Sequence, residues 1–83
     1  MATVKLAVEA RRVFDGLPRV MQARIEEVLV RLSRWPAVRG AKPLRHSLTG
    51  QYRIRTGDYR VQFRVGGDTV FVEKVGHRDG FYD

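Results

Sequence analysis

The chain of 83 residues contains no cysteine, so its fold cannot depend on disulfides or thiolate metal ligands, and a cysteine nucleophile is excluded. It also lacks any apolar run close to the roughly 20 residues that a membrane-spanning helix needs, and its first residues lack the apolar stretch of a signal peptide. We therefore expect a cytoplasmic protein that does not associate with a membrane. The length predicts one small domain, residues 1–83.

Acidic residues and lysine are scarce. Nine Asp and Glu stand against sixteen Lys and Arg, which gives a formal net charge of +7, and only three of the sixteen are lysine. The other thirteen are arginine, whose planar guanidinium suits phosphate and base-stacking contacts better than the lysine ammonium does. This charge on a small domain predicts a polyanionic ligand or an acidic protein partner. Composition alone leaves open that the basic surface only keeps the protein in solution.

The first half of the chain predicts one strand and two helices. Residues 3–8 alternate weakly between apolar and polar and predict a strand, and residues 9–14 have a helical composition that stops at Gly16. A second helix is predicted between Pro18 and Pro36 because its apolar residues fall on a single stripe. These residues are Met21, Ile25, Val28, Leu29 and Leu32.

The second half predicts a meander of three strands. Apolar residues alternate with arginines on both sides of the turn at residues 57–58, which indicates an amphipathic hairpin. Residues 69–75 are more apolar and predict a third strand, central in the sheet. Residues 37–50 show no period and predict a loop, and Trp35 is expected to pack back on the core. The predicted class is α+β, in the order β-α-α-β-β-β, with an antiparallel-rich sheet and a helical hairpin on one face.

The polar side of the predicted hairpin is rich in arginine. Arg53 and Arg55 leave the first strand on one side, and Arg60 and Arg64 leave the second strand on the same side. Side chains that face each other across two strands lie only about 5 Å apart, so like charges there repel unless an anion binds. A face that is merely solvated would mix Lys, Glu and Thr. The cluster therefore predicts an anion-binding surface in preference to a solvated sheet face.

The end of the last predicted strand carries His77 and Arg78, which we expect to overhang the arginine face. Histidine ordinarily changes its charge near neutral pH, so His77 is a candidate proton-transfer group. The simpler interpretation is a polar contact at a strand end. Tyr82 reaches the same face if the tail folds back. His46, in the predicted loop, is interpreted as structural or exposed.

Two runs of the sequence resemble the RelE branch of the RelE/ParE toxin superfamily. They are LRHSLTGQYRIRTGDYRV at residues 44–61 and VGHR at residues 75–78, which is followed by Tyr82. The resemblance implies the toxin of a type II toxin–antitoxin system, an endoribonuclease that cleaves mRNA in the ribosomal decoding site without a metal or other cofactor. It implies the ribosome and mRNA as partners, together with an acidic cognate antitoxin in a hetero-oligomer. Carried over by position, the family's active-site residues fall on Arg53, Arg55, Arg60, Arg78 and Tyr82.

One departure from the family concerns the proton acceptor. Well-known members carry lysine at the positions of Arg53 and Arg55, whereas arginine stays protonated at neutral pH and is a poor base. Metal-free cleavage by the 2′-OH needs charge stabilisation on the phosphorane, a proton acceptor and a donor to the 5′-oxygen. We predict that the strand arginines hold the phosphate and that Arg78 stabilises or protonates the leaving oxygen. The hypothesis for the proton acceptor is His77 or Tyr82.

Two alternatives stay open. A ParE-like inhibitor of DNA gyrase would share the fold but act by binding a topoisomerase, and such proteins usually lack the dense strand arginines and the terminal tyrosine. A non-enzymatic nucleic-acid-binding module would use its arginines only to hold phosphates, and its binding would fall steeply with salt. The strand arginines, Arg78 and Tyr82 together favour the nuclease.

Overall fold

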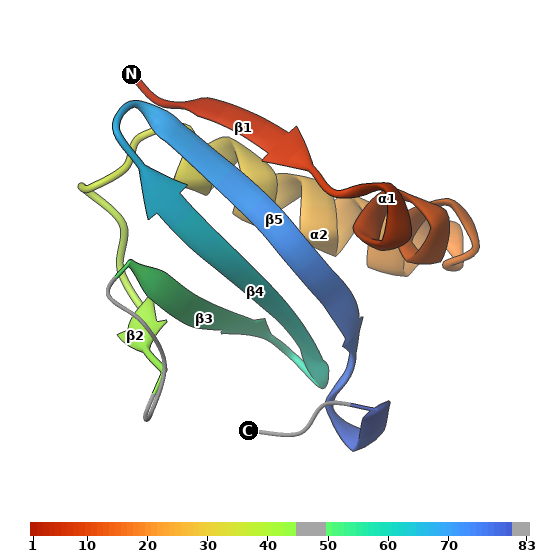
Figure 1. The fold of residues 1–83 in the computed structure, drawn as a ribbon. Coiled ribbons are helices and arrows are strands. Elements are labelled where there is room, and N and C mark those ends of the chain that lie inside the picture. Colours follow the sequence, from red (N-terminus) through yellow and green to blue (C-terminus); the bar gives the residue numbers. More distant parts are fainter. Residues whose placement is uncertain (45–49, 81–83) are drawn as a thin grey trace.

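The computed structural model describes residues 1–44 and 50–80 as a single mixed sheet with two helices on one side of it (Figure 1). The elements in chain order are β1 (Thr3–Leu6), α1 (Val8–Asp15), α2 (Arg19–Leu32), β2 (Lys42–Pro43), β3 (Gln51–Thr56), β4 (Tyr59–Gly66), β5 (Thr69–His77) and a 3-10 helix (Arg78–Gly80). The strand order across the sheet is β1-β5-β4-β3-β2, with β1 parallel to β5 and the other pairs antiparallel. The predicted α+β class, with its helical hairpin and antiparallel-rich sheet, is confirmed. The short strand β2 lies in the segment that the sequence predicted as loop.

Gly16, Pro18 and Ser33 flank the two helices. Gly16 follows α1, and its N–H donates to the carbonyl of Val13 at 3.1 Å. Pro18, whose φ of −57° suits a helix start, precedes α2. At the other end of α2, the Ser33 hydroxyl donates to the Val30 carbonyl at 2.5 Å. Within the described residues, neither helix is long and apolar enough to cross a membrane.

The core lies between the helices and the sheet face that they cover, which we call the inner face. Its buried residues are Ala10, Phe14, Ile25, Val28, Leu32, Ile54, Val61, Phe63, Val70, Val72 and Val75. Trp35 packs beside them, with its ring centroid 4.7 Å from that of Tyr52 and 5.4 Å from that of Phe63. The prediction that Trp35 packs back on the core is therefore confirmed. Because both helices lie on the inner face, the opposite side of the sheet, the outer face, is left to polar side chains.

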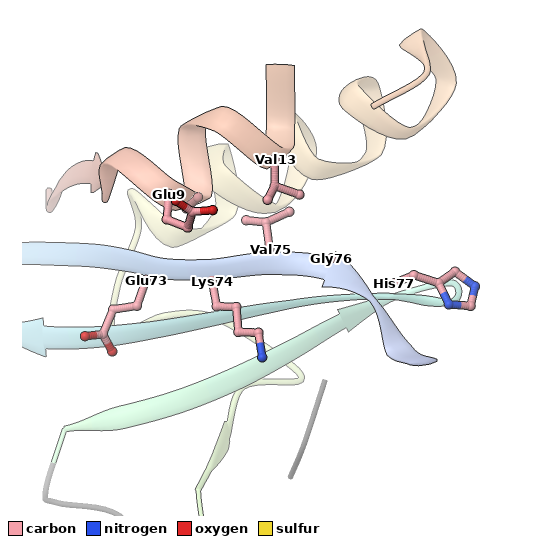
Figure 2. A pocket seen from close by; sticks show the side chains of 8 residues that line it. Glu9, Val13, Glu73, Lys74, Val75, Gly76 and His77 are labelled. Carbon is pink, nitrogen blue, oxygen red and sulfur yellow. The ribbon is translucent and has the colours of Figure 1, made fainter. Parts of the chain in front are cut away.

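A bulge in β5 changes which side chains of this strand face the helices. Phe63 pairs with Val72 and Gln62 pairs with Lys74, so Glu73 is the additional residue on β5. Figure 2 shows Glu73 and Lys74 both pointing away from α1, whereas Val75 points toward it. The bulge explains how Val72 and Val75, which are three residues apart, are both buried.

Candidate functional site

Basic side chains gather on the outer face of the sheet and come from all five strands. They are Lys5 on β1, Lys42 on β2, Arg53 and Arg55 on β3, Arg60 and Arg64 on β4, and Lys74 on β5. Strand alternation is the cause, because their neighbours Ile54 and Val61 point to the inner face and are buried. The expectation that the four hairpin arginines share one face agrees with the strand register.

Arg55 lies directly opposite Arg60, next to the turn that joins β3 and β4. Like charges in this relation destabilise a sheet because the facing Cβ atoms are only about 5 Å apart. The ion pair of Arg64 with Glu73, whose Nε and Oε2 atoms are 3.6 Å apart, lies farther along β4. Arg53 is two residues from Arg55 on β3 and pairs with Lys42 on β2. One end of the outer face thus concentrates positive charge in a small area.

The 3-10 helix brings Arg78 to the same end of the sheet. Its backbone N–H donates to the carbonyl oxygen of Asp58 at 2.7 Å, and Asp58 belongs to the turn between β3 and β4. The side chain of Arg78 is 61% exposed. The backbone of Arg78 therefore lies at the end of the sheet where Arg55 and Arg60 face each other.

His77, in contrast, lies on the inner face. It stands directly opposite Tyr59, and the two rings meet edge to face with centroids 5.4 Å apart. The expectation that His77 overhangs the arginine face is therefore wrong. The reason is the bulge at Glu73, which reverses the alternation of β5, so that Val75 and His77 share the side that Val72 occupies before the bulge.

A hydrogen bond ties the His77 ring to the 3-10 helix that follows it. Its Nδ1 accepts the backbone N–H of Asp79 at 3.2 Å, and the Asp79 carboxylate lies 3.4 Å from the same nitrogen. As an acceptor, Nδ1 is engaged by the backbone of the residue two positions along the chain. The contact places Nδ1 against the backbone of the 3-10 helix, on the inner face and away from the strand arginines.

Among the cavities of the described residues, two lie on the helix side near the end of the sheet that carries Arg55 and Arg60. One of about 250 Å³ lies under the β3–β4 turn and is lined in part by Met21, Arg24, Tyr59 and His77. The other, of about 330 Å³, lies between α1 and β5 beside Gly76 (Figure 2). Neither is lined by the strand arginines, which, in the part of the chain that the structure describes, form a cationic surface.

Some members of the outer face were not predicted, and some predicted residues lie outside the described part of the chain. Lys42 was missed because a strand of two residues shows no period, and Lys74 because the bulge hides its side from simple alternation. Tyr82 and His46 fall outside the described residues. Their predicted positions therefore stay predictions.

Comparison with known proteins identifies the family. A family model described as the ParE toxin of the type II toxin–antitoxin system parDE matches residues 4–80. The chain belongs to the RelE/ParE toxin superfamily. One of its relatives is Toxin RelG of Mycobacterium tuberculosis (strain ATCC 25618 / H37Rv). The two sequences are 39% identical over 83 residues, which cover 96% of this chain and 94% of the relative.

Solved structures of RelE toxins share this fold. The toxin of the RelBE2 toxin–antitoxin complex from M. tuberculosis has 38% sequence identity and a TM-score of 0.79, and the match covers 93% of this chain and 98% of that chain. The isolated RelE toxin of E. coli has a TM-score of 0.80 at 22% identity, with 93% and 84% of the two chains covered. At that lower identity the likeness concerns the fold alone.

Proposed function

We propose that this RelE-type toxin is an endoribonuclease that cuts mRNA in the ribosomal decoding site without a metal and so inhibits translation. The observation that carries the proposal is the Arg55–Arg60 pair on the outer face. Two cations directly opposite each other cost stability and make no contribution to the core. A phosphate bound between them converts this repulsion into two charge-assisted contacts.

The reaction is a transesterification within the RNA backbone. The 2′-oxygen loses its proton to a base and bonds to the adjacent phosphorus, the bond to the 5′-oxygen breaks, and that oxygen takes up a proton. The products are a 2′,3′-cyclic phosphate and a 5′-hydroxyl. Negative charge grows on the phosphorane oxygens, so Arg55 and Arg60 act most strongly in the transition state. Removing one donor of this kind typically costs roughly 10²–10³ in rate.

The proton transfers need groups other than the strand arginines, which stay protonated. Of the two candidates from the sequence, His77 lies on the inner face with Nδ1 engaged by Asp79. We therefore assign the larger share of proton transfer to Tyr82, which the family resemblance implies as an active-site residue. Arg78 is assigned to stabilise or protonate the leaving 5′-oxygen. His77 becomes a positioning residue, since its Nδ1 holds the backbone of the turn that carries Arg78.

The test uses purified ribosomes programmed with a defined mRNA and the wild-type toxin. We expect cleavage within the codon in the decoding site, with a 2′,3′-cyclic phosphate on the upstream fragment and no loss of rate in excess EDTA once the ribosomes are fixed by cross-linking. Fragments with 3′-hydroxyl ends, or cleavage that EDTA abolishes, would contradict the mechanism. RNA binding without any cleavage would favour the non-enzymatic alternative.

An inhibitor of DNA gyrase is the second candidate, and the description of the matching family model as a ParE toxin favours it. A gyrase supercoiling assay separates the two functions. We expect no inhibition at toxin concentrations that cleave all programmed mRNA. Inhibition of supercoiling without mRNA cleavage would assign the chain to the gyrase inhibitors.

We also propose an acidic cognate antitoxin as the partner that neutralises this toxin in a hetero-oligomer. The toxin of the similar M. tuberculosis structure is in a toxin–antitoxin complex. The net charge of +7 and the cationic outer face are complementary to an acidic segment that folds on binding. A short acidic reading frame beside the gene, whose product restores growth when co-expressed, is the expected result.

A further inference from the structure

An aromatic side chain lies on the otherwise polar outer face, at the end away from Arg55 and Arg60. Phe71 on β5 pairs with Arg64 on β4 and with Lys5 on β1, so these three side chains share the outer face. Phe71 is only partly buried and does not belong to the core between helices and sheet. Packing of the core therefore does not account for an aromatic residue at this position.

Arg64 lies over the ring of Phe71. Its guanidinium carbon is 4.9 Å from the ring centroid, and its Nε is 3.6 Å from a carboxylate oxygen of Glu73. The Phe71 ring supports the guanidinium from below and Glu73 holds its edge. The Arg64 side chain is nevertheless 47% exposed, so it offers accessible surface to solvent.

We propose that the Arg64–Phe71 pair is a stacking platform for one base of the mRNA, outside the nucleotides that are cleaved. The inference rests on the proposed function, because it extends the RNA path from the cleavage site along the outer face. Arg60 and Arg64 are four residues apart on β4, or about 13 Å at the rise of a strand. Arg64 is thus too far from Arg60 to contact the same phosphate, and it contacts a neighbouring part of the same strand. Lys5 and Lys74 flank the platform and suit the phosphates on either side.

Charge and shape favour a nucleobase over an acidic peptide at this corner. The charge of Arg64 is already partly balanced by Glu73, which weakens its attraction for a further carboxylate. A base is neutral and planar, and single-stranded RNA is bound by stacking its bases on aromatic rings and on arginine guanidinium planes. The fixed guanidinium above Phe71 provides such a plane.

The test measures how much the bases add to RNA affinity, without requiring cleavage. Fluorescence anisotropy gives the Kd of the toxin for a short labelled single-stranded RNA and for an abasic ribose-phosphate chain of the same length. Arg64→Lys keeps the positive charge near Glu73 but removes the guanidinium plane. We expect the affinity ratio of RNA to abasic chain to fall about 5- to 150-fold, the range for one stacked base.

Two further variants make the result specific. Phe71→Leu keeps an apolar cover on the outer face but removes the ring under Arg64, and we expect the same direction of change. Arg11→Lys, on the exposed side of α1, makes the same chemical change away from the outer face and leaves the ratio as in the wild type.

Several outcomes would overturn the platform. The first is an unchanged affinity ratio in Arg64→Lys, and the second is an equal loss of affinity for RNA and for the abasic chain. Polyglutamate serves as a third ligand that represents an acidic peptide. The third outcome is that Arg64→Lys loses affinity for polyglutamate but retains the RNA ratio. The last of these would assign the corner to a protein partner. A wild type that cleaves mRNA while Arg64→Lys keeps the full ratio removes the platform alone. If the ratio falls in Arg64→Lys but the wild type never cleaves mRNA, the nuclease function alone is removed.

Discussion

Replacing Arg55 by glutamine should stabilise the free toxin. Arg55 is exposed and stands directly opposite Arg60, and within the described residues its side chain has no hydrogen bond or ion pair that the change would remove. Cross-strand pairs contribute roughly 0.2–1 kcal/mol, with repulsion for like charges. Coulomb's law gives a similar figure, about 0.6 kcal/mol for unit charges about 7 Å apart in water. We therefore expect the free energy of unfolding to rise by about 0.5 kcal/mol.

The measurement is urea unfolding of wild type and Arg55→Gln at low ionic strength, with thermal unfolding as a second readout. For a domain of this size the gain corresponds to about 2–4 °C in Tm. In about 1 M salt, where the Debye length is only about 3 Å, most of the gain should disappear. Salt dependence distinguishes relief of repulsion from a change in strand propensity.

Arg64→Gln is the matched control on the same face. It removes the ion pair with Glu73 and the contact with Phe71, so stability should fall, by about 0.5–1.5 kcal/mol. If Arg55→Gln is neutral or destabilising at low salt while Arg64→Gln behaves as described, the reasoning that the Arg55–Arg60 pair is repulsive is refuted.

Three further predictions concern the fold and the turn that carries Arg78. Trp35→Ala should cost about 3 kcal/mol in urea unfolding because it opens the aromatic cluster at the edge of the core, and a cost under about 1 kcal/mol would contradict that packing. Gly50→Ala should lower the free energy of unfolding by about 2–3 kcal/mol and Gly67→Ala by about 1 kcal/mol. Both glycines have a positive φ, but only at Gly50 would a new Cβ lie 3.0 Å from a backbone oxygen, so equal losses would refute the clash. His77→Asn, whose side-chain oxygen can still accept the Asp79 N–H, should cleave within about threefold of wild type, and His77→Leu about tenfold more slowly. A loss of about 10²–10⁴ in His77→Asn would instead make His77 a proton-transfer group.

The order and class of the elements could be predicted because strong periods define them. Alternation over residues 52–65 determined the hairpin and the face that its arginines share, and the single stripe of α2 determined the side that it buries. The side on which His77 lies could not be predicted, since one additional residue at Glu73 reverses the alternation of β5. A bulge depends on the partner strand, and the sequence of β5 alone contains no sign of it.

The same limit applies to the composition of the site. Lys42 reaches the outer face through pairing of β2 with β3, a contact between segments whose spacing shows no period. The pairing of Arg55 with Arg60 could be predicted from the sequence, because a two-residue turn determines the register of the hairpin around it. Local patterns thus predicted the centre of the candidate site, and long-range pairing determined its periphery.

The most direct test of the central claim is the single-turnover rate of mRNA cleavage on programmed ribosomes for Arg55→Gln, Arg60→Gln and the exposed helix control Arg11→Gln. Saturating toxin isolates the chemical step from binding. We predict rates lower by roughly 10²–10³ for each strand variant and a wild-type rate for the control. Rates within a few-fold of wild type for both Arg55→Gln and Arg60→Gln would contradict the assignment of the outer face as the catalytic surface.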